Sequence, residues 1–318
     1  MNRIVAALSG LLLLAGCGGG ASGDADTLHV GSQRGGTKAL MLASGVLDGA
    51  PYKIEWSEFP AAQHLLEAIG GGAVDVGLTG DAPFIFAYQS GSRIKAVGAQ
   101  RTNERPRGRL SLIVPRNSNV RKLFDLKGKT IATTRGSVGH YLIIRGLQSE
   151  QLPPHWVKLA FLTPGDAKAA FDSGSIDAWA TWVPFLSTAL EGGAKIIVDE
   201  QDVMNPLAFD VANENAIKGK AALLRDFLER EAKALRWAEK HIEEYTRILS
   251  KETGLPTKVA RDYVIKQMRR AVPIDDAVIE EQRQVLTDFQ KAGAVAGTRD
   301  LSAGFEKSFS KTEVAAAQ

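Results

Sequence analysis

The chain has almost no cysteine: Cys17 is the only one in 318 residues. A single thiol cannot form an internal disulfide, and a lone cysteine in an exported protein indicates a use other than folding. Only five histidines accompany it, and none is spaced with Cys or acidic residues as metal ligands are. We therefore expect no metal site and no cofactor.

Catalytic motifs are also missing. The sequence has no Walker loop, no G-x-S-x-G and no H-E-x-x-H. The run "RGG" at 34–36 follows an expected strand but lacks the full dinucleotide-binding fingerprint. These absences predict a protein that is not an enzyme.

The chain has little excess of either charge, since 39 basic and 36 acidic residues leave a formal net charge of +3. An excess this small gives no basis for nucleic-acid binding. After the first residues there is no long apolar run, so no membrane-spanning helix is expected in the body of the chain.

The N-terminal residues indicate export. Arg3 precedes an apolar run, 4–15, that is too short to span a bilayer and ends in small residues, which is typical of a signal peptide over 1–16. The order Leu14-Ala15-Gly16-Cys17 resembles a bacterial lipobox, in which the cysteine is lipidated; the alternative is an ordinary signal peptide with an incidental cysteine. The residues 17–26 then read as the lipidated cysteine and a flexible tether. We expect a lipid-anchored protein on the periplasmic side of the cell envelope.

From residue 27 onward, apolar runs typical of strands alternate with helical spacing, and the pattern occurs twice. This alternation predicts an α/β fold with mixed, mostly parallel sheets flanked by helices. Three pairs of matching residues share nearly the same offset, 102, 101 and 101 positions: Asp75 with Asp177, Pro83 with Pro184, and Gly36 with Ser137. Generic βαβ periodicity would align apolar runs, but not these turn residues as well.

The repeat predicts two similar lobes. The expected division is 27–110 with 204–318 for lobe 1, and 111–203 for lobe 2, with the run 105–119 holding one crossing strand and 205–213 a return strand. The long amphipathic helices after residue 213 are expected to serve packing and solvent exposure, not a binding site.

Ligands of open α/β sheets bind beyond the carboxyl ends of the strands. The repeat places four strand-to-helix turns there: 32–36, 79–83, 134–137 and 181–184. Each leads into an expected helix, whose first N–H groups are unpaired and suit an anion.

The candidate ligand-binding residues lie in or near these turns: Gln33, Gln63, Thr79, Gly80, Asp81, Arg135, Gly136, Ser137, His140 and Trp182. They offer amide, hydroxyl and guanidinium donors, and glycines that allow close approach to the backbone. Two alternatives remain open here. Asp81 either caps the next helix or faces the cleft, and Trp182 either covers the apolar part of a ligand or packs between lobes. Trp179, inside the strand, is expected in the core, and a lone His140 is more often structural.

The runs "EFPAAQHLLEAIGGGAVDVGLTGDAP", "LFDLKGKTIATTRGSVGHYLIIRGL" and "PGDAKAAFDSGSIDAWATWVPFL" resemble the aliphatic-sulfonate and taurine-binding proteins of ABC importers. This resemblance implies a two-lobed periplasmic-binding-protein fold of type II and an ABC permease and ATPase as partners of a monomer. It also implies a sulfonate held between the lobes by N–H and hydroxyl groups, which on this chain points to Gln33, Thr79, Gly80, Asp81, Gly136, Ser137 and Trp182.

One position departs from that pattern. The resembling family often has an acid after the second tryptophan, and here Val183 follows Trp182. A carboxylate there would favour an ammonium group, as in taurine, so its loss favours an aliphatic or aromatic sulfonate with an uncharged tail. The alternatives are another small anion or heterocycle, such as nitrate, a carboxylate or a thiamine-pyrimidine precursor, and an enzyme on the same scaffold.

Overall fold

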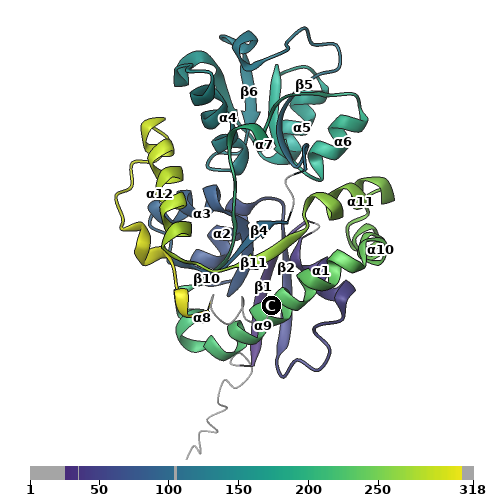
Figure 1. Ribbon diagram of the computed structural model, residues 1–318, viewed down its shortest axis with the longest axis vertical. Coiled ribbons are helices and arrows are strands. Elements are labelled where there is room, and N and C mark those ends of the chain that lie inside the picture. Colours follow the sequence, from purple (N-terminus) through teal and green to yellow (C-terminus); the bar gives the residue numbers. More distant parts are fainter. Residues whose placement is uncertain (1–25, 35, 104–105, 310–318) are drawn as a thin grey trace, which may run out of the picture.

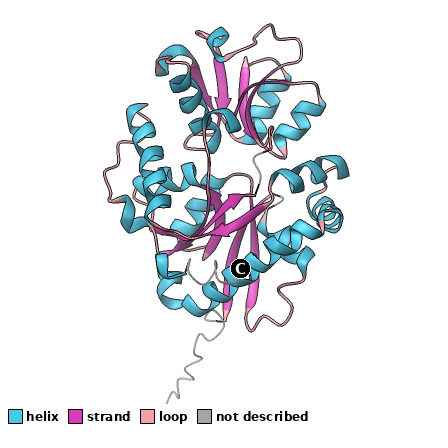
Figure 2. Cartoon of the chain, in the orientation of Figure 1, coloured by secondary structure: helices cyan, strands magenta, loops and turns pink. Residues whose placement is uncertain are grey.

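The computed structural model describes residues 26–34, 36–103 and 106–309. Cys17, the signal peptide and the tether therefore lie outside the described residues. The described chain forms two sheets flanked by helices, one above the other in the view of Figures 1 and 2. We call the part built around each sheet a lobe.

The first sheet has the strand order β2-β1-β3-β10-β4-β11. Its strands are β1 (Thr27–Gln33), β2 (Lys53–Phe59), β3 (Val76–Gly80), β4 (Ile94–Thr102), β10 (Ala208–Asn213) and β11 (Arg269–Val272). β1 pairs in parallel with β2 and β3, whereas β10 runs antiparallel to both β3 and β4. β1 to β4 therefore share one direction, and β10, which returns from the second lobe, runs against them.

The second sheet repeats this arrangement in the order β7-β6-β8-β5-β9. Its strands are β5 (Leu110–Val114), β6 (Thr130–Thr133), β7 (Lys158–Phe161), β8 (Ala178–Trp182) and β9 (Lys195–Asp199). β6 is parallel to β7 and β8, and β5 is antiparallel to β8 and β9. In the second sheet, β6, β7, β8 and β9 correspond in position to β1, β2, β3 and β4 of the first, and β5 corresponds to β10. The repeat expected from the sequence is therefore a repeat of topology. The mixed sheets confirm the expected fold class.

Helices cover both faces of the sheets (Figure 2). Their bounds are α1 (Thr37–Ser44), α2 (Ala62–Gly70), α3 (Asp81–Gln89), α4 (Val138–Ser149), α5 (Pro164–Asp172), α6 (Phe185–Glu191), α7 (Glu200–Val203), α8 (Glu214–Gly219), α9 (Ala221–Lys240), α10 (Ile242–Thr253), α11 (Thr257–Lys266) and α12 (Asp276–Lys291). Short 3-10 turns occupy Leu123–Leu126, Pro154–Trp156 and Leu301–Gly304. α10 ends at Gly254, which adopts a left-handed conformation with φ 68°.

Two C-terminal helices contact both lobes. α12 packs against α3 of the first lobe and α4 of the second, while α11 packs against α6. Between α12 and α4, the Tyr141 hydroxyl donates to the Asp288 carboxylate at 2.9 Å, and Arg145 ion-pairs with the same carboxylate at 3.2 Å. The C-terminal region therefore holds the two lobes together at the side.

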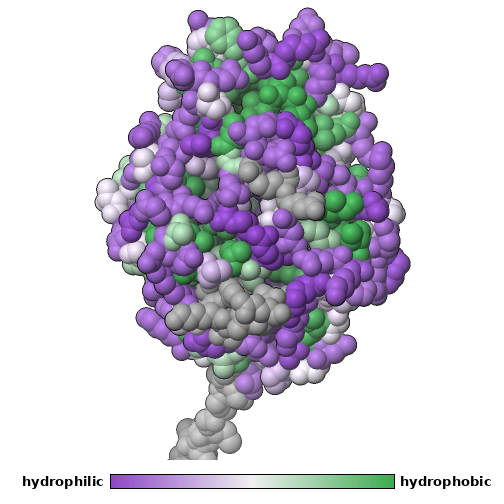
Figure 3. Space-filling view, in the orientation of Figure 1, coloured by the Kyte–Doolittle hydropathy of each residue, from purple (hydrophilic) through white to green (hydrophobic). Residues whose placement is uncertain are grey.

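The described helices include none that is both long and apolar enough to cross a bilayer. Hydrophilic side chains cover most of the face seen in Figure 3, with an apolar area over the second lobe. The large apolar side chains are mostly inside, and Trp179, Phe84 and Phe209 are the largest of those that are fully buried.

Candidate ligand-binding site

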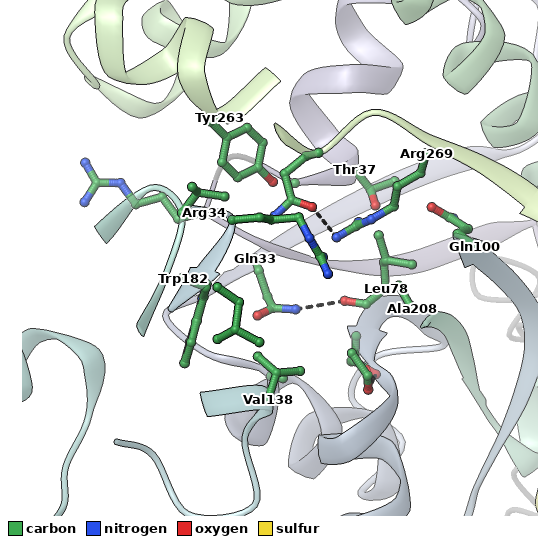
Figure 4. Close-up of a pocket in the computed structure, with 18 of the residues that line it drawn as sticks. Gln33, Arg34, Thr37, Leu78, Gln100, Val138, Trp182, Ala208, Tyr263 and Arg269 are labelled. Atoms are coloured by element: carbon green, nitrogen blue, oxygen red, sulfur yellow. Dashed lines mark hydrogen bonds between the residues drawn. The ribbon is translucent and has the colours of Figure 1, made fainter. Parts of the chain in front are cut away.

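A cavity of about 140 Å³ lies where the two lobes meet (Figure 4). The four turns that the sequence singled out all contribute to its wall, through Gly36, Thr79, Ser137 and Trp182 among others. The reason is topological: the equivalent strands of each lobe point their carboxyl ends at the same edge, and the two edges face each other. An engineered cavity of about 150 Å³ holds a benzene molecule, so this space suits a small organic ligand.

The first turns of α3 and α4 meet at this cavity. Gly80 precedes α3, and a Cβ atom there would lie 2.6 Å from Cγ1 of Val138, the first residue of α4. Glycine is therefore required for this approach of the lobes. Ser137 caps α4 by accepting the N–H of His140 at 3.1 Å, and the N–H groups of Val138 and Gly139 have no acceptor among the described residues. A helix N-terminus in this state suits an anion.

The two candidate glutamines both line the cavity. Gln33 donates its amide to the carbonyl of Leu78 at 2.9 Å, which turns the amide oxygen toward the cavity (Figure 4). Gln63, on α2 of the first lobe, donates to the carbonyl of Arg135 in the second lobe at 3.1 Å. The Gln63 amide oxygen is buried and has no hydrogen-bond partner among the described residues. Gln63 thus links the lobes at the rim of the cavity.

The two tryptophans of "DAWATW" have different positions. Trp182, the last residue of β8, lines the cavity with its neighbours Val183 and Pro184. Trp179 is 2% exposed and packs on Phe171 and Phe185, as expected for a core residue. Trp182 and Val138 lie at one end of the cavity in Figure 4, away from Tyr263 and Arg269.

Asp81 lies outside the wall of the cavity. Its carboxylate accepts the N–H of Leu207 at 2.9 Å and the N–H of Ala82 at 2.7 Å, and the side chain is fully buried. Burial raises the pKa of Asp81 to about 6, although the two backbone hydrogen bonds oppose the shift. Asp81 does not cap α3, because the N-cap residue is Gly80 and no side chain makes a cap hydrogen bond. The Asp81 carboxylate instead ties the start of α3 to the segment that enters β10.

Three other candidates also lie behind the wall. The exposed guanidinium of Arg135 stacks 4.0 Å from the centre of the Phe161 ring. Gly136, with φ 67°, packs under Phe86 and donates its N–H to Nδ1 of His140 at 3.2 Å. His140 is buried, and burial together with the charge of Arg135 lowers its pKa to about 4. These residues shape the start of α4 and are not among those that line this cavity. Their contact with a ligand stays a prediction.

The expectation that the C-terminal helices contribute no site was wrong. α9, α10, α11 and the following strand form the far wall of the cavity, with Glu231, Leu235, Ala238, Tyr245, Tyr263, Gln267, Met268 and Arg269. On α9, Leu224, Phe227, Leu228, Glu231 and Leu235 repeat at three- and four-residue spacing and form its buried face. The amphipathic pattern was correctly recognised, but it could not show that this face also closes a pocket.

A pair of carboxyl groups lies within this far wall. Glu231 accepts the hydroxyl of Thr37 at 3.1 Å, and the neighbouring Asp210 carboxylate accepts the amide of Gln100 at 2.9 Å. Burial raises the pKa of both carboxyls, and the charge of Asp210 raises that of Glu231 further. Both effects favour the neutral form of Glu231.

Among the described residues, the other charged side chains that line the cavity are cationic: Arg34, Arg109 and Arg269. Arg109 makes a double hydrogen bond to Glu200, at 2.5 and 2.6 Å, while the Arg269 side chain donates to the amide oxygen of Gln267. Cationic groups and helix N-termini around an apolar cavity favour a small organic anion.

Comparisons with known proteins agree with this geometry. The NMT1/THI5-like family model matches residues 55–245. The aliphatic sulfonates-binding protein of Escherichia coli (strain K12) is 32% identical over 89% of each chain.

Among solved structures, the alkanesulfonate-binding protein SsuA from Xanthomonas axonopodis pv. citri, bound to MOPS, has a TM-score of 0.80 and 27% identity, over 88% of this chain and 98% of that one. The desulfurization enzyme DSZB, at 17% identity and a TM-score of 0.65 over 92% of this chain and 100% of that one, shares the fold alone. The chain therefore belongs to the NMT1/THI5-like family, together with the aliphatic sulfonate-binding proteins that it resembles over most of its length.

Proposed function

We propose that this protein is the solute-binding component of an ABC importer and binds an organosulfonate in the cavity between its lobes. The observation that carries the proposal is the meeting of Gly80 and Val138, which brings the first turns of α3 and α4 from different lobes to one cavity. A sulfonate has three acceptor oxygens, and the N–H groups of Val138 and Gly139 together with the Ser137 hydroxyl supply donors there. The names of the relatives support the same ligand class.

The organic part of the ligand lies against Trp182, Val183 and Pro184. These residues form an apolar wall at the end of the cavity where the first turns of α3 and α4 meet. Val183 is 1% exposed and offers no charge to an ammonium group. Taurine is therefore a weaker ligand than an alkanesulfonate of equal length.

The first lobe comprises residues 27–110 and 204–318, and the second comprises residues 111–203. The two lobes close on the ligand by a hinge motion at the segments that cross between them. The closed form is presented to a permease and its ATPase on the periplasmic side of the membrane. Lipidation of Cys17 anchors a monomer there, and the tether up to residue 26 gives it reach.

The protein binds its ligand without converting it. Its one cysteine is Cys17, in the proposed anchor, and His140 lies behind the cavity wall. An enzyme on this scaffold would need reactive groups in the cleft. Incubation with each bound sulfonate, followed by mass spectrometry, is expected to return the compound unchanged.

The test is a calorimetric titration of the mature protein with propanesulfonate, benzenesulfonate, taurine, nitrate, acetate and a thiamine-pyrimidine precursor. We expect one site per chain for the first two, and a ligand at 100 times its Kd then stabilises the protein by about 2.7 kcal/mol in thermal unfolding. Small-angle scattering is expected to show compaction with the same compounds. Binding of nitrate or the pyrimidine, without binding of any sulfonate, would show that the ligand class is wrong.

A further inference from the structure

The cavity has a second polar end, opposite the first turns of α3 and α4. It is formed by Tyr245 of α10, Tyr263 of α11 and Arg269 of β11. In Figure 4 Tyr263 and Arg269 lie at the end of the cavity that is away from Trp182 and Val138. The hydroxyl of Tyr263 and the guanidinium of Arg269 both point into the cavity. A ligand that extends from the sulfonate end therefore meets donors at its tail.

Arg269 has no carboxylate partner among the residues that the structure describes. Its side chain hydrogen-bonds the Gln267 amide oxygen, and no described acid lies within ion-pairing distance of its guanidinium. Burial lowers the pKa of Arg269, and the charge of Arg109 lowers it further. A partly buried cation without a counter-ion is unfavourable, so a negative group of the ligand would relieve this cost.

The tyrosines add neutral donors beside this cation. Tyr245 and Tyr263 are 6% and 7% exposed, and burial raises the pKa of each hydroxyl, so both keep their protons. Neither hydroxyl has a hydrogen-bond partner within the described ranges, and neither is sealed off from solvent. A guanidinium, which only donates, beside two phenolic hydroxyls that can each donate is an arrangement that suits a carboxylate.

The described acidic residues near this end do not supply the negative charge that Arg269 lacks. Burial and the charge of Asp210 raise the pKa of Glu231 and so favour its neutral form, and the Asp210 carboxylate, which does not line the cavity, accepts a hydrogen bond from Gln100. Asp210 acts on Arg269 only through its charge at a distance. An ammonium group at the tail would meet Arg269 and Arg109, so a cationic tail is disfavoured.

We infer that Arg269, with the hydroxyls of Tyr245 and Tyr263, binds an acidic group at the tail of the ligand, and that the preferred ligand is a sulfonate that also carries a carboxylate. The inference rests on the proposed function of the cavity, and it replaces the uncharged tail expected from Val183. It makes Arg269 a specificity-determining residue.

The test compares four ligands that have the same three-carbon chain and differ only at the tail. They are 3-sulfopropanoate, 3-hydroxypropanesulfonate, propanesulfonate and 3-aminopropanesulfonate. We expect the Kd of 3-sulfopropanoate to be about 10- to 100-fold lower than that of propanesulfonate, because hydrogen bonds to charged groups contribute this much. The amino compound is expected to bind most weakly of the four.

Two variants separate the tail site from the rest of the pocket. Arg269→Gln is expected to abolish the preference for 3-sulfopropanoate over propanesulfonate, because the Kd of 3-sulfopropanoate rises much more than the Kd of propanesulfonate. Arg270→Gln is the matched control, because Arg270 is the next residue on β11, is exposed and does not line the cavity. Tyr263→Phe removes one donor and is expected to reduce the preference several-fold; it also serves if Arg269→Gln does not fold.

The outcomes distinguish the two proposals. If propanesulfonate binds and 3-sulfopropanoate binds no tighter, the tail site is wrong and the proposed function stands. Equal weakening of all four ligands by Arg269→Gln would also overturn the tail site, since it would show a structural role. If none of the four sulfonates binds, the proposed function itself is wrong and the inference falls with it.

Discussion

Asp75 and Asp177 hold the same place in the two lobes. The Asp75 carboxylate accepts the N–H of His29 at 2.8 Å, and the Asp177 carboxylate accepts the N–H of Thr130 at 2.8 Å. In both lobes the acid precedes the third strand and ties it to the first. The 102-residue offset seen in the sequence thus corresponds to one repeated structural device.

The two acids differ in burial, so replacing each of them by alanine is expected to lower the free energy of unfolding by a different amount. Asp75 also pairs with Lys220 at 2.8 Å, with side chains 11% and 12% exposed, whereas Asp177 and its partner Lys129 are 39% and 43% exposed. We expect Asp75→Ala to lower the free energy of unfolding by about 2–3 kcal/mol and Asp177→Ala by about 1 kcal/mol. Urea denaturation measures both; equal costs would contradict the difference in burial.

Asp81 predicts a pH dependence of stability. Its folded pKa of about 6 exceeds the ordinary 3.8, so between these values the native state holds a proton that the unfolded chain has released. The free energy of unfolding therefore decreases as pH rises from about 4 to 6, by up to about 3 kcal/mol from this group.

The measurement is denaturant unfolding from pH 4 to 8 for the wild type and Asp81→Asn. Asparagine does not titrate, so the variant should lack this part of the slope. A wild-type minus variant difference that stays constant over that range would show that Asp81 does not titrate as described.

Trp182 and Trp179 give a matched pair for fluorescence. Trp182 lines the cavity and Trp179 is in the core. We expect Trp182→Phe to remove most of the ligand-dependent change in tryptophan emission and Trp179→Phe to keep it. Trp182→Ala is expected to raise the Kd of an alkanesulfonate about 10-fold or more, from the loss of aromatic contact area. A full ligand response in Trp182→Phe would place the organic part of the ligand elsewhere.

Asp288 connects α12 with α4 of the second lobe through contacts that do not involve the ligand. Its carboxylate receives the Tyr141 hydroxyl and the Arg145 guanidinium of α4. Asp288→Ala leaves both without this partner, and we expect a loss of about 2–4 kcal/mol in the free energy of unfolding. Asp276→Ala, on the same helix at a position where the side chain is 97% exposed, should cost less than about 1 kcal/mol. The Kd for ligand is expected to change little in either variant, since neither residue lines the cavity.

The strand and turn pattern could be predicted because it is local. Apolar runs, the small residues after them and the prolines of the following helices recur at a fixed offset, and the same strand order in both sheets explains why. The four turns were found for this reason, and Ser137, Gly80 and Trp182 lie on the cavity as a consequence.

The direction in which a turn residue points was not predictable. Asp81 faces inward because the N–H of Leu207, 126 residues later, lies beside it. The far wall was missed for the same physical reason. Arg269 lies opposite Thr102 in the first sheet, and no local pattern announces a pairing across 167 residues.

The central claim is that one cavity between the lobes holds a sulfonate at the first turns of α3 and α4. It is tested most directly by crystals grown with 3-sulfopropanoate and measured for the anomalous signal of sulfur. The account predicts a ligand sulfur peak within hydrogen-bonding reach of Ser137 and the N–H groups of Val138 and Gly139, with the carboxylate at Arg269. A sulfur peak beside Arg269, or outside the cavity, would contradict it.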